Sequence, residues 1–224
     1  MRNIIIAIGE HYHILNRGNN KQLIFLDNRD WIRFLFLLVY LQSPVVFQNV
    51  SRQVSYFVKN RVFNISDDEI EEVYRKRYVE LVDFVLMPNH FHLTIHELKE
   101  GGVAQYMQRI LCGYTKYFNT KYGKSGHLFQ GPYKAVHIKN NTQLLYLSTY
   151  IHKNSREMAL WKNREHLYPW SRYQDYVGQN RWGKLLSQDI VSGQFSNKKE
   201  YADFVKSSTA KEITENLEGD LLIR

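Results

Sequence analysis

Residues 79–97, VELVDFVLMPNHFHLTIHE, hold two apolar stretches separated by the turn pair Pro-Asn, and this pattern predicts a β-hairpin over about residues 78–97. Successive side chains of an extended chain point to opposite faces. The second strand therefore turns its apolar side chains to the core and a polar set to the other face. That polar set is His90, His92, Thr94 and His96. The hairpin thus places imidazoles on one side of a sheet.

The elements around the hairpin predict one antiparallel sheet. Alternation and helical periodicity place further elements as follows: strands over 4–15 and within YKAVHI, and helices over 28–42, after Gly101-Gly102 and over 141–153. The order strand, helix, strand, strand, helix, strand predicts an α+β fold, a ferredoxin-like split β-α-β layer with helices packed on one face. We therefore expect the histidine face to be open.

The basic charge of the chain is concentrated in one segment. The net charge is +8, and residues 101–156 contain eight Lys and Arg with no Asp or Glu, so the rest of the chain is balanced. Such a block is typical of a polyanion-binding surface, and its aromatic side chains could stack on bases or could belong to the core. The expected DNA-binding residues are Arg109, Lys116, Lys121, Lys124, Lys134, Lys139 and Lys153.

Cysteine content and hydropathy exclude other classes. Cys112 is the only cysteine, which excludes a disulfide within the chain and a cysteine-built zinc site. The longest apolar stretch, WIRFLFLLVYL, is too short to span a bilayer and contains Arg33. We expect a soluble cytoplasmic protein with no membrane partner.

Two pairs of histidines have the spacing of metal ligands on a strand. His90 and His92 form one pair, and His11 and His13 form the other. Residues two apart on a strand lie roughly 7 Å apart on one face, so each pair could bind one ion. Either pair could equally be polar side chains of an open sheet face, and the spacing alone does not choose.

A two-histidine metal site needs a third ligand and a reacting group. Asp83 on the partner strand is one possible ligand. Tyr150 and Asn154 are four residues apart and share one face at the end of the helix over 141–153. A tyrosine beside a cation could attack a phosphate, and an amide could complete the metal site.

Four motifs occur in an order that resembles a known family. MPNHFHLTI, GYTKYFNTKYGKSGHLFQGPYKA, YLSTYIHKNS and YPWSRYQDYVG follow one another as in single-tyrosine HUH transposases of the REP-associated branch. The first strand and its turn, HYHILNRGNNKQLIF, fit as well. The resemblance covers about residues 8–175 and weakly extends to about 206.

The resemblance implies a role for each site residue. His90, His92 and Asn154 would bind a divalent metal, Mg²⁺ or Mn²⁺, and Tyr150 on its helix would be the nucleophile. His11 and His13 have no catalytic counterpart in the family. The sequence departs from the family pattern at Ser155, where proline is common.

The resemblance also implies the reaction and the partner. Tyr150 would cut single-stranded DNA through a 5′-phosphotyrosine intermediate and rejoin it, guided by a DNA hairpin, with the protein acting as a monomer or homodimer. The alternatives are an inactive hairpin-binding module for DNA or RNA on the same fold, a metal nuclease that uses water, and a replication initiator. The initiators are larger, and no helicase motif is present.

The resemblance and the composition predict the organisation of the chain. Residues 1–175 would form the transposase domain, with an insertion over about 43–77. Residues 176–224 would form a C-terminal helical extension, in which Asn197 and Glu200 have the spacing of a capping box.

Overall fold

A computed structural model describes residues 4–209, whose strands form one antiparallel sheet in the order β2-β3-β1-β4. The strands are β1 (His11–Arg17), β2 (Val79–Met87), β3 (His90–Glu97) and β4 (Lys134–His137). Helices lie between β1 and β2 and between β3 and β4, while β2 and β3 form the predicted hairpin. This topology confirms the α+β, ferredoxin-like prediction.

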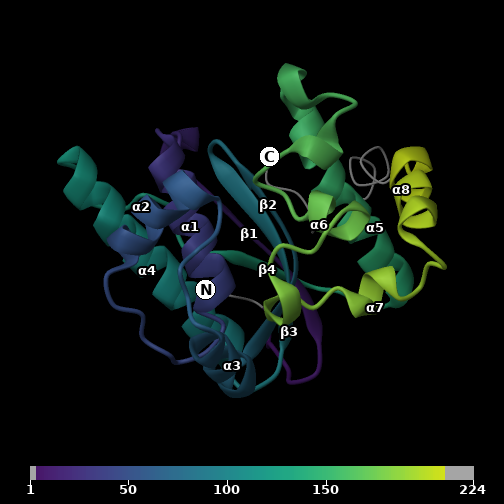
Figure 1. The fold of residues 1–224 in the computed structure, drawn as a ribbon, viewed down its shortest axis with the longest axis horizontal. Helices are drawn as coiled ribbons and strands as arrows, with labels where there is room; N and C mark the ends of the chain where they lie inside the picture. Colours follow the sequence, from purple (N-terminus) through teal and green to yellow (C-terminus); the bar gives the residue numbers. More distant parts are fainter. Residues whose placement is uncertain (1–3, 210–224) are drawn as a thin grey trace.

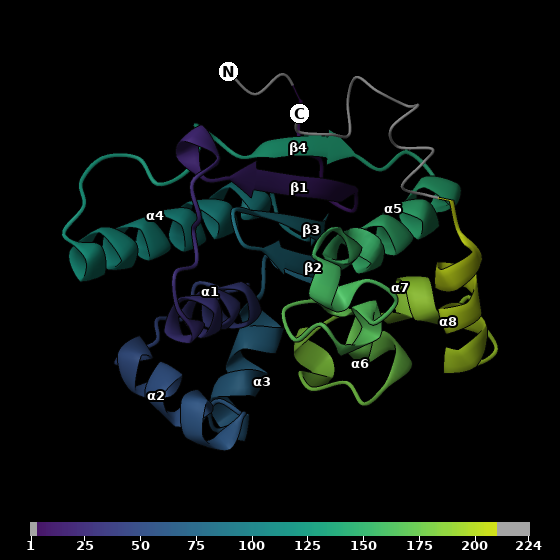
Figure 2. The same ribbon diagram turned by 90° about the horizontal axis from the view of Figure 1, so that it is seen from above.

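Helices lie on both faces of the sheet, as Figure 1 and the view from above in Figure 2 show. One group comprises α1 (Asn28–Tyr40), α2 (Val50–Asn60), α3 (Asp67–Lys76) and α4 (Gly102–Tyr122). The other comprises α5 (Asn141–Lys153), α6 (Tyr173–Val177), α7 (Asp189–Ser192) and α8 (Lys198–Ser207). Short 3₁₀ turns complete the described chain, namely Asn19–Lys21, Asn154–Glu157, Ala159–Trp161, Glu165–Leu167 and Gly183–Leu185.

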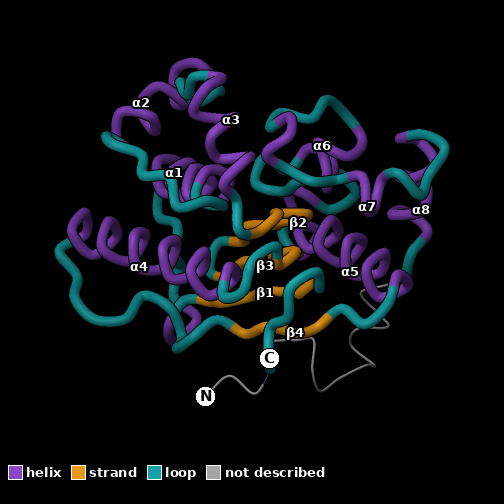
Figure 3. Tube along the Cα trace, turned by 90° about the horizontal axis from the view of Figure 1, so that it is seen from below, coloured by secondary structure: helices purple, strands orange, loops and turns teal. Residues whose placement is uncertain are grey.

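The expectation of an open histidine face was wrong. Helix α5 covers the β2–β3 half of that face, where Val85 and Met87 pack with Leu147 and Ile151. The physical reason lies in β2, which is apolar at nearly every position and is buried almost throughout. A strand with two apolar faces needs a cover on each of them. The first group of helices supplies one cover, and α5 supplies the other (Figure 3).

A bulge in β2 decides which side chains lie under α5. The register between β2 and β3 shifts between Leu81 and Asp83. Leu81 belongs to the larger core, which includes α1 and α4, whereas Val85 belongs to the cluster under α5. An extra residue in one strand reverses the alternation that follows it. Asp83 and Val85 therefore lie opposite Thr94 and His92, on the histidine face.

The first strand begins later than predicted. It starts at His11 rather than at residue 4, because Gly9 has a φ of +83°, and the chain turns there. The predicted helices agree better, since α5 spans Asn141–Lys153 and α1 ends at Tyr40. Periodic apolar positions and capping residues mark helices more clearly than the alternation marks this strand.

The segment over 43–77 contains α2 and α3. Val54 and Phe57 of α2 are buried in the larger core. The Ser66 hydroxyl accepts from the Glu69 amide, and the Glu69 carboxylate accepts from the Ser66 amide, so a capping box starts α3. The description of this segment as an insertion, and the domain division at residue 175, stay predictions.

The C-terminal part of the described chain is joined to α5 by buried hydrogen bonds. The Tyr201 hydroxyl of α8 lies 2.7 Å from Ser148 Oγ and 2.8 Å from His152 Nδ1. Asp83 of β2 accepts from Ser148 and bonds with His152 Nε2 at 3.0 Å. In α8 the Asn197 side chain accepts from the Glu200 amide at the predicted spacing. Residues 210–224 of the predicted extension lie outside the described residues.

The described residues include no helix that is both long enough and apolar enough to cross a membrane. This holds for α1, which contains most of the longest apolar stretch of the sequence, and for α4, the longest helix described.

Replacing Tyr201 by Phe tests the buried bridge between α8 and α5. Loss of the hydroxyl leaves Ser148 and His152 short of a partner, and we expect the free energy of unfolding to fall by about 1–3 kcal/mol. Urea denaturation measures the change. Tyr146→Phe is the matched control, because Tyr146 lies on α5 with 40% of its surface exposed and should change stability by less than about 0.5 kcal/mol. Equal effects of the two changes would contradict the bridge.

Candidate active site

Strand β3 and helix α5 bring three of the predicted site residues together. The Tyr150 ring lies perpendicular to the His92 ring, with centroids 5.3 Å apart. The His90 and His92 rings lie 5.2 Å apart and also meet at nearly a right angle. His92 is buried with 3% of its surface exposed, while His90 at the start of β3 is partly exposed. The tyrosine thus lies over the histidine face of its own chain.

Asn154 follows α5 and is buried without a hydrogen-bond partner for its side chain. It starts the 3₁₀ turn Asn154–Glu157, so the helix tightens where the sequence departs from the family pattern at Ser155. Only 1% of its surface is exposed, and among the described residues neither Oδ1 nor Nδ2 has a partner. A buried amide without partners costs free energy, so this side chain requires an explanation.

Two imidazoles and an amide oxygen fit a divalent cation. Imidazole nitrogen and amide oxygen are both ordinary ligands of first-row divalent metals, and oxygen is the preferred ligand of Mg²⁺ and Mn²⁺. Among residues 4–209 no three His, Cys, Asp or Glu side chains form a metal-binding group. A cation at this place would therefore depend on His90, His92 and the Asn154 amide together.

His13 also reaches the site, although the resemblance gave it no catalytic counterpart. Its Nε2 lies 2.9 Å from His92 Nδ1, and both rings are buried. In the register between β1 and β3, His13 pairs with Thr94 and Leu15 pairs with His92, so the two histidines meet diagonally. Burial lowers the pKa of His13 to about 3, and the ring is neutral. The second His-x-His motif in the sequence was the available signal.

The other histidines of this face lie away from the tyrosine. His11 and His96 pair across β1 and β3 and stack with centroids 4.3 Å apart. His96 Nδ1 lies 2.7 Å from Glu80 Oε2. Burial and the neighbouring His96 lower the pKa of His11 to about 4, although Glu80 and Glu10 oppose the shift.

Asp83, the alternative ligand suggested by the sequence, is used elsewhere. One carboxylate oxygen accepts from Ser148, and the other lies 3.0 Å from His152 Nε2. The second oxygen also accepts from the Phe84 amide. These bonds hold Asp83 at the contact between β2 and α5.

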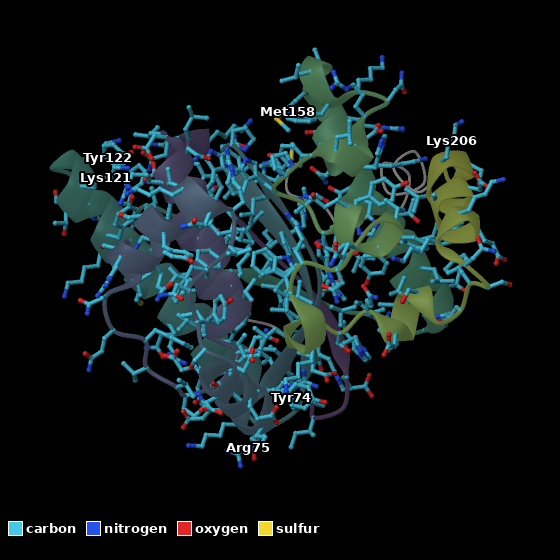
Figure 4. All side chains as sticks on the ribbon, in the orientation of Figure 1. Tyr74, Arg75, Lys121, Tyr122, Met158 and Lys206 are labelled. Atoms are coloured by element: carbon cyan, nitrogen blue, oxygen red, sulfur yellow. The ribbon has the colours of Figure 1, made fainter. Side chains whose placement is uncertain are left out.

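Three of the predicted DNA-binding side chains are bound within the protein. Arg109 donates to the backbone oxygens of Ser43 and Val45. Lys121 lies 2.6 Å from Asp27 and 2.7 Å from Asp30, and Figure 4 shows it at the end of α4, far from α8. Lys153 is buried and donates to backbone oxygens of the segment that ends α8.

The remaining predicted contacts lie on the surface. The exposed side chains are Lys116, Lys124, Lys134 and Lys139. The aromatic side chains of the basic segment mostly belong to the core, because α4 needs an apolar stripe against the sheet. Those buried are Tyr114, Phe118, Phe129 and Tyr133.

Comparisons with known proteins bear on this arrangement. A family model described as "Transposase IS200 like" matches residues 43–154, which is half of the chain and includes β2, β3, α4, β4 and α5. A solved structure of a REP-associated tyrosine transposase bound to a REP hairpin is similar with a TM-score of 0.50 and 15% identity, over 88% of this chain and 94% of that chain. This likeness supports the fold. No curated protein matches.

His11→Gln tests the lowered pKa of His11, which is partly buried where it stacks on His96. In the unfolded chain His11 takes up a proton below about pH 6.5, whereas in the folded protein its pKa is about 4. Stability therefore declines as the pH falls from 6.5 to 4. Between about pH 7 and 5, the free energy of unfolding should fall by about 1 kcal/mol less in the variant than in the parent, after allowance for solvent screening.

Urea denaturation at each pH measures this difference. His127→Gln is the control for replacing a histidine outside the stack, because His127 is exposed. Parallel curves for the parent and His11→Gln would show that His11 is not held neutral.

Proposed function

This chain belongs to the IS200-like transposase family, and from that premise we propose that it cuts and rejoins single-stranded DNA with Tyr150 as the nucleophile. The observation that carries the proposal is the perpendicular contact of Tyr150 with His92, one helical turn before the unpartnered amide of Asn154. The family membership supports a transposase, and this contact supports the tyrosine chemistry.

In the proposed reaction, Tyr150 Oη attacks the scissile phosphorus of the DNA strand. The bond from phosphorus to the 3′ oxygen breaks, the phenol proton is lost, and the departing 3′ oxygen is protonated. The products are a 5′-phosphotyrosine and a free 3′-OH. Another 3′-OH reverses the step and rejoins DNA, so no outside energy source is needed.

His90, His92 and Asn154 would hold the divalent metal, Mg²⁺ or Mn²⁺. The chemistry that such a cation supplies when bound is polarisation of the phosphate and stabilisation of the departing oxygen. Burial of His92 under the tyrosine helix and of Asn154 at the end of that helix supports this proposal. Residues 101–156, which include Tyr150 and Asn154, bring no carboxylate that would repel a phosphate.

The proposed partner is single-stranded DNA that contains a hairpin. The similar solved structure holds a REP hairpin, and this chain shares its fold. The exposed lysines of the basic segment supply charge for phosphate contacts, which give affinity without sequence choice.

The proposed unit is a monomer or a homodimer, acting in the cytoplasm. The contact between Tyr150 and His92 within one chain supports action of the tyrosine in cis, and α5 is bound to β2 and α8 of that chain.

Tyr150→Phe tests the nucleophile. Single-stranded hairpin oligonucleotides from the DNA flanking the gene are incubated with the protein and Mn²⁺, and a denaturing gel detects a covalent adduct. We expect the adduct to need the metal and to be absent from Tyr150→Phe and His90→Ala, because each removes a required group. Tyr146→Phe, on the exposed face of the same helix, should retain it.

Two results would contradict the proposal. Cleavage by Tyr150→Phe that leaves a free 5′-phosphate would indicate a nuclease that uses water. Tight binding of the hairpin without any adduct, across all flanking sequences, would indicate an inactive binding protein.

The surface lysines generate a separate prediction about salt. We expect replacement of Lys116, Lys124, Lys134 and Lys139 by Ala to reduce the slope of log affinity against log salt by about 0.7–0.9 for each phosphate that a lysine no longer neutralises. Lys121→Ala should leave the slope unchanged, because its ammonium is bound to Asp27 and Asp30. Fluorescence anisotropy with a labelled hairpin measures both slopes. If Lys121→Ala reduced the slope more than replacement of the four exposed lysines did, the DNA would bind nearer to Lys121 than to those lysines.

A further inference from the structure

We propose that His13 is a positioning residue, which accepts a hydrogen bond from His92 and thereby directs the other ring nitrogen of His92 to the metal. The bond would run from His92 Nδ1–H to His13 Nε2. This inference rests on the proposed function and deepens it, because it adds a residue of β1 to a site otherwise built from β3 and the end of α5.

The contact itself is close and enclosed. The two nitrogens lie 2.9 Å apart, and the rings are nearly parallel, with an interplanar angle of 20°. Both histidines are buried, each ring lies beside the Tyr150 ring of α5, and pairing of β1 with β3 fixes their backbones. Water therefore competes little for this bond.

Two proton arrangements are possible for a pair of neutral imidazoles. A neutral imidazole carries its proton on one nitrogen and a lone pair on the other. If His13 donated, His92 would have to accept at Nδ1 and keep its proton on Nε2, with no lone pair there for a cation. If His92 donates from Nδ1, its Nε2 carries the lone pair that a metal ligand needs. Only the second arrangement is compatible with metal binding by His92.

The other nitrogen of His13, Nδ1, has no hydrogen-bond partner among the described residues in either arrangement. When His13 accepts at Nε2, its proton is on Nδ1, and that buried nitrogen is a donor. A buried polar donor without a partner is unfavourable, and an apolar side chain at this position would avoid the penalty. The presence of a histidine is explained by its effect on the neighbouring ligand.

Outer partners of metal-binding histidines usually fix the ring and its tautomer. Their loss typically weakens metal affinity by about 10–100-fold. The usual partners are carboxylates or backbone oxygens, and here the partner is a second imidazole. We therefore expect His13→Ala to weaken Mn²⁺ binding within that range.

The test combines ring NMR with metal titration. In the metal-free protein, ¹⁵N spectra of the histidine rings should show His92 protonated on Nδ1 and unprotonated on Nε2. His13→Ala should lose this preference and bind Mn²⁺ more weakly in calorimetry. His13→Gln should restore part of both, because its amide oxygen can accept the same bond.

His11→Ala is the matched control, since His11 lies two residues away on the same face but stacks on His96. It should keep the His92 tautomer and the Mn²⁺ affinity of the parent. Circular dichroism establishes that each variant is folded, so that a loss of binding reports on the site.

The outcomes separate the two proposals. A His92 ring protonated on Nε2 in the parent would overturn the inference. So would a His13→Ala variant that binds Mn²⁺ as tightly as the parent, if His92→Ala no longer binds Mn²⁺. In both cases the proposed function would stand. No Mn²⁺ binding by the parent would overturn the metal-dependent function and the role of His13 with it.

Discussion

Strand β2 is apolar on both of its faces, and the need to cover both faces organises the molecule. Helices α1 and α4 cover one face, and α5 covers the other, so the helix that carries Tyr150 is held in place by ordinary apolar packing. The same cover encloses His92 of β3. Burial of the site is thus a consequence of the core, and an enclosed polar environment forms where a sheet face would otherwise meet water.

Local sequence patterns predicted much of this site, because its main parts are local. Alternation placed His90 and His92 on one face, and helical spacing placed Tyr150 and Asn154 on another, with the family resemblance joining them. The contact of His13 with His92 depends on the register between β1 and β3, which lie far apart in the chain. The acceptors of Arg109 and Lys121 are equally distant in sequence. The hairpin pattern alone does not predict the cover over the histidine face, because that cover follows from the second apolar face of β2.

Some basic side chains of residues 101–156 form ion pairs within the protein, and others are exposed at its surface. Residues 101–156 have no acidic side chain, but Asp27 and Asp30 at the start of α1 form ion pairs with Lys121. The positive charge of Lys121 is therefore neutralised within the protein. The lysines that stay exposed lie in the later part of α4, in the loop after it, in β4 and just before α5. The lysines proposed to contact DNA phosphates are thus different residues from those proposed to act on the scissile phosphate.

The bulge between Leu81 and Asp83 gives β2 an unusual sensitivity to length. Exchanging one apolar side chain for another there alters packing at a single point. Deleting one residue would restore simple alternation and move every later side chain of the strand to the opposite face. Relatives of this chain should therefore exchange one apolar side chain of β2 for another more readily than they change its number of residues, and gaps in their alignment should fall in the loops on either side.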